Sequence, residues 1–228
     1  MDDVLKRVLK NVPKRPLYVA QYPTGLDLKL EEFEKTVLQA QEVQVKPKVV
    51  GILGVGGVGK TTLATAFFNL NRSKYNESAF IFNVREMSLN ILKSKLIEGL
   101  KLGNIETECT EEGILKHPLS CHALLVLDDV NDTNQQEALL TIKGFLSPES
   151  LILLTSRDKH VLESHGVLEG SLYYLKGLNI PQSKQLFCSY AFNQLHPLPE
   201  FADLVDQFVS VCDGLPLSLK VVGALVYG

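Results

Sequence analysis

The chain has 228 residues, of which 45% are hydrophobic, 21% charged and 7% aromatic. This composition excludes an intrinsically disordered protein and is enough for one α/β domain with a small helical addition. The formal net charge of −3 gives no overall attraction to nucleic acid, and the sequence has no apolar run of about 18 residues, as a membrane-spanning helix would need. The four cysteines show no paired spacing, which favours a reducing compartment, cytoplasmic or nuclear.

Residues 1–25 predict a short N-terminal helix followed by a linker. Basic residues between Lys6 and Arg15 interleave with apolar residues at helical spacing, which is typical of a solvated helix face; a basic binding patch is the alternative. Prolines at 13, 16 and 23 then favour an extended chain. Helical patterning resumes over 28–41.

From residue 48 onward, short apolar runs alternate with helical patterns. Buried strands are expected at 49–53, 79–84, 123–127 and 151–155. The helices expected between and after them lie at 60–71, 89–102, 134–143 and 158–164. Strand alternating with helix predicts an α/β fold with a doubly wound parallel sheet.

The last fifty residues have a different pattern. A fifth strand is expected at 172–175, followed by Gly177 and by three helices at 183–192, 201–212 and 217–227. We therefore predict an N-terminal helix and linker at 1–25, a nucleotide-binding domain at 26–177 and a small helical subdomain at 178–228.

A glycine-rich segment follows the first strand and matches the P-loop pattern G-x-x-x-x-G-K-[ST]. The predicted phosphate-binding residues are Gly54, Val55, Gly56, Gly57, Val58, Gly59, Lys60, Thr61 and Thr62. Glycines allow the backbone N–H groups to converge on phosphate oxygens at a helix N-terminus, where Lys60 adds a positive charge. The Thr61 hydroxyl is the predicted magnesium ligand. The alternative is a structural glycine-rich turn.

Two acids, Asp128 and Asp129, end the apolar strand at 123–127. This is the Walker B arrangement, in which Asp128 would hold magnesium, directly or through water. Asp129 stands where a water-activating carboxylate could act, and its short side chain suggests slow turnover. Two acids that cap a strand or begin a turn are the alternative.

Arg157 follows the fourth strand, so it is expected at the same edge of the sheet as the phosphates. An arginine there can sense a γ-phosphate. An ordinary ion pair with Asp158 or Glu163 is the alternative.

The chain resembles the NB-ARC nucleotide-binding module of plant nucleotide-binding leucine-rich-repeat (NLR) disease-resistance proteins. The resemblance rests on five motifs in order: GILGVGGVGKTTLA at 51–64, FNVRE at 82–86, LVLDDV at 125–130, TSRD at 155–158 and GLPL at 214–217. It implies that Pro216 packs against the nucleotide and that Gly25 and Leu26 lie near the adenine. The family usually has two threonines before the arginine of TSRD, whereas this chain has one.

The resemblance also implies a winged-helix subdomain and leucine-rich repeats, which these 228 residues do not contain, so a fragment, a truncated product or a reduced family member is expected. The implied function is an ADP- or ATP-binding switch in plant immunity, with Mg²⁺ as cofactor and at most slow ATPase activity. An ordinary P-loop ATPase or kinase is an alternative. A decoy that pairs with full-length NLR relatives is another.

Overall fold

The computed structural model describes residues 15–40, 47–100, 121–132 and 135–227. The predicted N-terminal helix therefore lies outside the described residues. Five parallel strands form one sheet in the order β2-β3-β4-β1-β5. The strands are β1 (Lys48–Leu53), β2 (Glu77–Ile81), β3 (Ala123–Leu127), β4 (Leu151–Ser156) and β5 (Leu172–Tyr174). The predicted α/β fold with a parallel sheet is confirmed.

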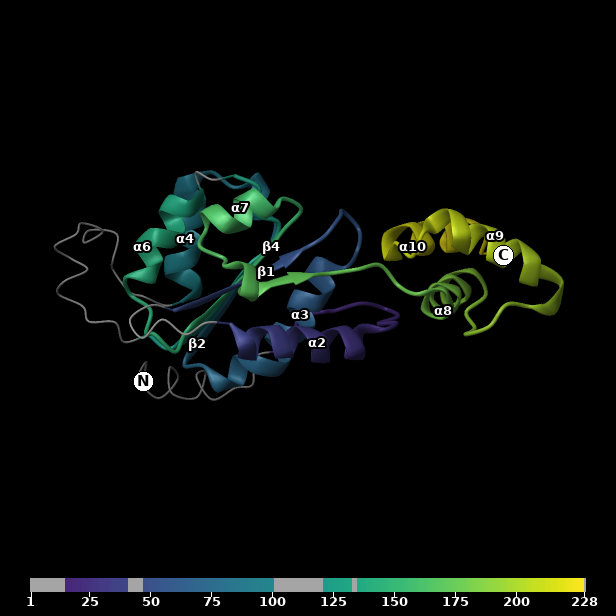
Figure 1. The fold of residues 1–228 in the computed structure, drawn as a ribbon, viewed down its shortest axis with the longest axis horizontal. Helices are drawn as coiled ribbons and strands as arrows, with labels where there is room; N and C mark the ends of the chain where they lie inside the picture. Colours follow the sequence, from purple (N-terminus) through teal and green to yellow (C-terminus); the bar gives the residue numbers. More distant parts are fainter. Residues whose placement is uncertain (1–14, 41–46, 101–120, 133–134, 228) are drawn as a thin grey trace, which may run out of the picture.

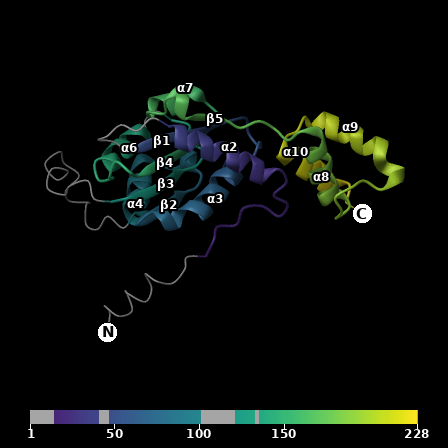
Figure 2. The same ribbon diagram turned by 60° about the horizontal axis from the view of Figure 1, so that its bottom comes forward.

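Helices cover both faces of this sheet (Figures 1 and 2). One face packs against α2 (Leu26–Gln39) and α3 (Lys60–Asn71). The other packs against α4 (Leu89–Gly99), α6 (Gln136–Lys143) and α7 (Lys159–Ser164). Short 3₁₀ turns occur at η1 (Arg72–Lys74), η2 (Val84–Glu86) and η5 (Glu169–Ser171).

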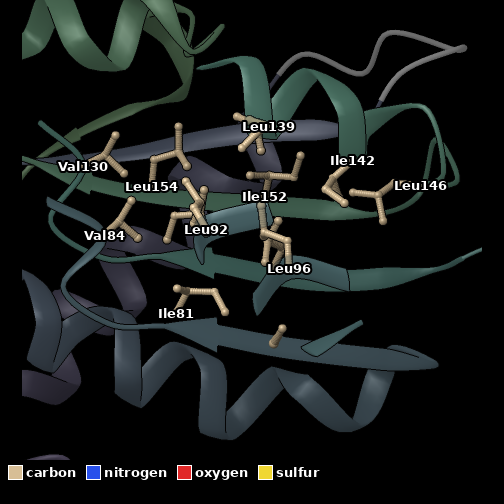
Figure 3. Close-up of a cluster of buried hydrophobic side chains, with 14 of the residues drawn as sticks. Ile81, Val84, Leu92, Leu96, Val130, Leu139, Ile142, Leu146, Ile152 and Leu154 are labelled. Carbon is tan, nitrogen blue, oxygen red and sulfur yellow. The ribbon is translucent and has the colours of Figure 1, made fainter. Parts of the chain in front are cut away.

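The central strands β3 and β4 are buried along their whole length, which explains why their sequences are continuous apolar runs. Alternate residues point to opposite faces: Leu125 and Ile152 join the cluster under α4 and α6, whereas Leu124 and Leu153 join the one under α2 and α3. Figure 3 shows the first of these clusters, with side chains of the two helices meeting those of the strands. Two separate apolar layers thus fix the sheet between its helices.

Three helices follow the sheet and have an apolar cluster of their own. They are α8 (Ile180–Ala191), α9 (Ala202–Cys212), preceded by η6 (Pro199–Phe201), and α10 (Pro216–Leu225). Figure 1 shows them at one end of the molecule, joined to the sheet by the segment after β5. None of the described helices is long and apolar enough to span a membrane.

Most predicted elements differ from the observed ones by one or two residues at an end, and two larger differences have a clear local cause. The strand expected at 79–84 ends at Ile81, because Asn83 adopts a left-handed conformation (φ 53°) and the η2 turn begins at Val84. The helix expected from 183 begins at Ile180, where Asn179 forms a capping box with Gln182. Residues 101 and 102 of the helix expected at 89–102 lie outside the described residues.

Candidate nucleotide-binding site

The glycine-rich loop connects the carboxyl end of β1 to the start of α3. Gly57 (φ 79°) and Gly59 (φ 103°) are both left-handed, a conformation that a side chain would strain. Gly59 is the N-cap of α3 and offers no side-chain cap. The first N–H groups of the helix therefore stay available to an anion, as in a phosphate-binding loop.

Lys60 lies in the first turn of α3 and is only 7% exposed. Its ammonium group donates to two carbonyls of the loop, Gly54 O at 2.8 Å and Val55 O at 3.0 Å. Burial lowers the pKa of Lys60, and the nearby Arg157 lowers it further. The loop thus holds a desolvated cation, which makes the site attractive to a phosphate.

Asp128 follows β3 and is 2% exposed. Thr61 Oγ1 lies 3.0 Å from both of its carboxylate oxygens, and Thr155 Oγ1 donates to Oδ1 at 2.7 Å. Burial raises the pKa of Asp128, and the two hydroxyl donors oppose that rise. The structure therefore brings together the two predicted magnesium ligands.

These oxygen donors suit magnesium, which is commonly bound through one or two carboxylates with phosphates and water. Among the described residues, no group of three or more His, Cys, Asp and Glu side chains is placed to hold a metal ion. The Asp128 carboxylate and the Thr61 hydroxyl fit a magnesium ion that is bound together with a phosphate.

Asp129 has a left-handed backbone (φ 60°), and its N–H donates to Thr155 Oγ1 at 2.9 Å. Its carboxylate faces two guanidinium groups: Arg85 Nη2 lies 3.2 Å from Oδ1, and Arg157 Nε lies 3.9 Å from the same atom. Sequence reasoning singled out Asp129 and Arg157 but missed Arg85. The FNVRE segment contained that residue, yet only the fold places η2 beside the end of β3.

The alternative that Arg157 forms an ion pair with Asp158 or Glu163 is wrong. Asp158 caps α7 by accepting from the His160 N–H, and Glu163 lies 3.5 Å from Lys159 Nζ. Arg157 instead faces Asp129 and stays 53% exposed. It also lies close to the loop, since a Cβ built on Gly56 would be 3.0 Å from the guanidinium.

A cavity of about 460 Å³ opens from the P-loop toward the helices α8 and α10, a size typical of small-ligand sites. Its polar end is lined by Gly56, Gly57, Val58, Gly59, Lys60, Thr61, Thr62, Asp128, Asp129, Thr155 and Arg157. Apolar side chains also line it, among them Leu26, Leu175, Leu178, Leu186, Tyr190 and Pro216, together with Leu217, which lies beside Gly57 of the P-loop. Gly25, Gly54 and Val55 are not among its lining residues.

The GLPL segment meets the P-loop directly. Leu217 N–H donates to Gly57 O at 3.2 Å, so the loop satisfies one of the free N–H groups in the first turn of α10. Pro216 occupies the first position of that helix, where a missing N–H costs nothing. The last helices are therefore anchored at the phosphate site.

The cavity also has a wall that the sequence interpretation treated as a linker. Residues 18–24 all line it. The prolines had predicted an extended chain correctly. The resemblance placed only its end, Gly25 and Leu26, near the adenine, and of these two Leu26 lines the cavity. Only the fold places residues 18–24 there.

Three features define a nucleotide-binding protein of the P-loop class: the order of the strands, the glycine-rich loop, and the Thr61 hydroxyl paired with the Asp128 carboxylate. The family model described as "NB-ARC domain" matches residues 27–196. The chain belongs to the NB-ARC domain family, as its motifs predicted.

Curated relatives with similar sequences are plant disease-resistance proteins. The disease resistance protein RPV1 of Vitis rotundifolia is 33% identical over 233 residues, covering 98% of this chain and 16% of RPV1. RUN1 of the same species is 36% identical over 188 residues, covering 78% of this chain and 14% of RUN1. The chain thus spans less than a fifth of the length of either relative.

Solved structures with the same fold include Cdc6p from Pyrobaculum aerophilum, with a TM-score of 0.64 and 12% identity over 91% of this chain and 62% of that one. A signal transduction ATPase with numerous domains (STAND) from Pyrococcus horikoshii has a TM-score of 0.52 and 20% identity over 94% of this chain and 31% of that one. These likenesses support the P-loop fold.

Proposed function

We propose that this chain is the nucleotide-binding switch module of a plant disease-resistance protein, and that the cavity takes ADP or ATP. The observation that carries the proposal is that two parts of the chain line the same cavity. The P-loop of the sheet domain lines the cavity, and so do Pro216 and Leu217 of α10, beside Gly57. A ligand seated there would touch both the sheet domain and the helical part, so its identity could change how the two are held together.

Magnesium is the proposed partner of the bound nucleotide. Asp128 and Thr61 would hold it, and it would offset the negative charge of the phosphates. Lys60 would exchange its two carbonyl contacts for phosphate oxygens, which are stronger partners for an ammonium group. Arg157 would respond to the outermost phosphate from the edge of the cavity.

We further propose that hydrolysis is slow or absent. Asp129 is the only carboxylate besides Asp128 among the described residues that line the cavity, and two arginines face it. A carboxylate oxygen that already faces two guanidinium groups is less available to accept a proton from a water molecule. The protein would then remain long enough in each nucleotide state to act as a switch.

Nucleotide extraction from the purified chain, followed by single-turnover measurement with Mg·ATP, tests the proposal. We expect co-purified or readily loaded adenine nucleotide and a turnover far below the roughly 1–100 s⁻¹ of kinases. Turnover in that range would favour an ordinary P-loop ATPase or kinase. No binding of either nucleotide would overturn the proposed function.

A further inference from the structure

The segment 17–24, here called the strap, forms neither a helix nor a strand, and its residues 18–24 line the cavity. Figure 2 shows this segment, in purple, leading past α3 to the start of α2. Among the described residues, Thr24 N–H to Tyr22 O (2.9 Å) is its one internal backbone hydrogen bond. Backbone that lacks such bonds needs other partners to keep one position.

Asn69, in the last turn of α3, supplies them. Its Oδ1 accepts from Leu17 N–H at 2.9 Å, and its Nδ2 donates to Leu17 O at 2.8 Å. One side-chain amide thus makes the pair of bonds that a neighbouring strand would make. Leu17 and Val19 also pack partly buried on the apolar layer under α3.

The other end of the strap is fastened to the helical part. The Tyr22 hydroxyl donates to Asn193 Oδ1 at 2.9 Å, and its ring packs edge-on against that of Tyr190, with the ring centroids 4.9 Å apart. The strap is therefore tied at Leu17 and at Tyr22. Between the two ties, residues 18–21 line the cavity.

We propose that Asn69 is a positioning residue for nucleotide binding: it holds the strap as the wall that contacts the nucleoside part of the ligand. The inference rests on the proposed function. Helix α3 carries Lys60 and Thr61 at its start and Asn69 near its end. The same rigid helix would thus fix the distance between the phosphate site and the strap.

A role for Asn69 in the helix itself does not explain these contacts. Its side-chain amide bonds to a residue 52 positions earlier in the chain and caps no group of α3. Alanine is a better helix former than asparagine by several tenths of a kcal/mol. Asn69→Ala should therefore release the strap while leaving α3 intact.

The first experiment compares ADP with inorganic tripolyphosphate as ligands of the full chain and of Asn69→Ala. We expect Asn69→Ala to release ADP on the order of tenfold faster, as the loss of two hydrogen bonds that order a wall would do. Tripolyphosphate affinity should change less than about twofold, since the P-loop is untouched. Asn69→Asp keeps the acceptor and loses the donor, so its rate of ADP release should lie between those of the parent and Asn69→Ala.

Asn90→Ala is the matched control. Asn90 is exposed in α4, and its side chain makes no hydrogen bond to a described residue. It should bind both ligands like the parent. Equal ADP release by Asn69→Ala and the parent would overturn the inference, and so would an equal loss of ADP and tripolyphosphate binding.

A second readout needs no nucleotide. The chain has no tryptophan, so Tyr18→Trp, at a strap residue that is 78% exposed, would report from the strap alone. Fluorescence anisotropy should fall when Asn69→Ala is added to Tyr18→Trp, and unchanged anisotropy would contradict the proposed tie. If the parent bound no nucleotide, the proposed function would fail, while this measurement would still decide whether Asn69 holds the strap.

Discussion

The hydroxyl of Thr61 lies 3.0 Å from each carboxylate oxygen of Asp128, which joins the first turn of α3 to the end of β3. This contact places two hard oxygen donors together at the polar end of the cavity. If a magnesium ion bound here with a nucleotide, the Thr61 hydroxyl and the Asp128 carboxylate would hold the ion instead of hydrogen-bonding to each other. Substitution of Asp128 is therefore expected to make ATP binding independent of magnesium.

Asp128→Ala should abolish the magnesium dependence of ATP binding, because it removes the carboxylate from the proposed metal site. Asp129→Ala should keep that dependence and alter turnover more than affinity. Calorimetric titration of ATP with and without magnesium checks the first effect, and single-turnover assays check the second. If both variants bound Mg·ATP like the parent, Asp128 would be a strand cap and the metal assignment would be wrong.

Lys60→Ala should weaken ATP binding by roughly tenfold or more, since a charge-assisted hydrogen bond contributes about 1.5–3 kcal/mol. The fold should survive, because within the described part of the chain the Lys60 ammonium group donates only to carbonyls of its own loop. Titration calorimetry with a circular-dichroism spectrum separates the two effects. Unchanged ATP affinity in a folded variant would remove Lys60 from the phosphate site.

Gly57→Ala should disturb the attachment of α10 as well as the loop. A Cβ at Gly57 would lie 2.8 Å from Leu217 Cβ, on a backbone with φ of +79°. We expect a loss of about 1–3 kcal/mol in the free energy of unfolding, as such strain costs. Hydrogen exchange should also quicken at the Leu217 amide, which donates to Gly57 O.

Gly59→Ala is the control for backbone strain alone. Gly59 also has a positive φ (+103°), but a Cβ there would meet no atom of a described residue within 4 Å. It should weaken the loop without speeding exchange at Leu217. Equal rates of hydrogen exchange at the Leu217 amide in the two variants would mean that the P-loop does not hold α10.

The sequence predicted the sheet and the phosphate end of the site because each depends on local patterns. The strand at 123–127 is one apolar run, and the P-loop carries its chemistry within eight residues, Gly54 to Thr61. Arg85 and the strap could not be found this way. Arg85 reaches Asp129 across 44 positions, and Tyr22 reaches Asn193 across 171, so their roles depend on tertiary packing that leaves no periodic signal.

A buried histidine distant from the P-loop gives the chain a predictable pH dependence. His165 is 1% exposed at the end of α7, its Nδ1 lies 2.7 Å from Val161 O, and its Nε2 has no hydrogen-bond partner among the described residues. Burial lowers the pKa of His165; Lys143 lowers it further, whereas the Val161 carbonyl and Asp132 oppose the shift. Protonation would therefore place an additional, unsatisfied N–H in the core.

The sign of the effect follows from proton binding. Below the unfolded pKa of about 6.5 the unfolded chain binds a proton that folded His165 does not, so the free energy of unfolding should fall as the pH is lowered from 7 to 5. The slope from this residue approaches about 1.4 kcal/mol per pH unit. Urea unfolding of the parent and of His165→Gln at several pH values measures it. His165→Gln should lose this part of the slope even if it is less stable at pH 7, whereas His160→Gln, at a side chain that is 94% exposed, should keep it. A parent and a His165→Gln variant with equal slopes would show that His165 is protonated as easily in the folded chain as in the unfolded one.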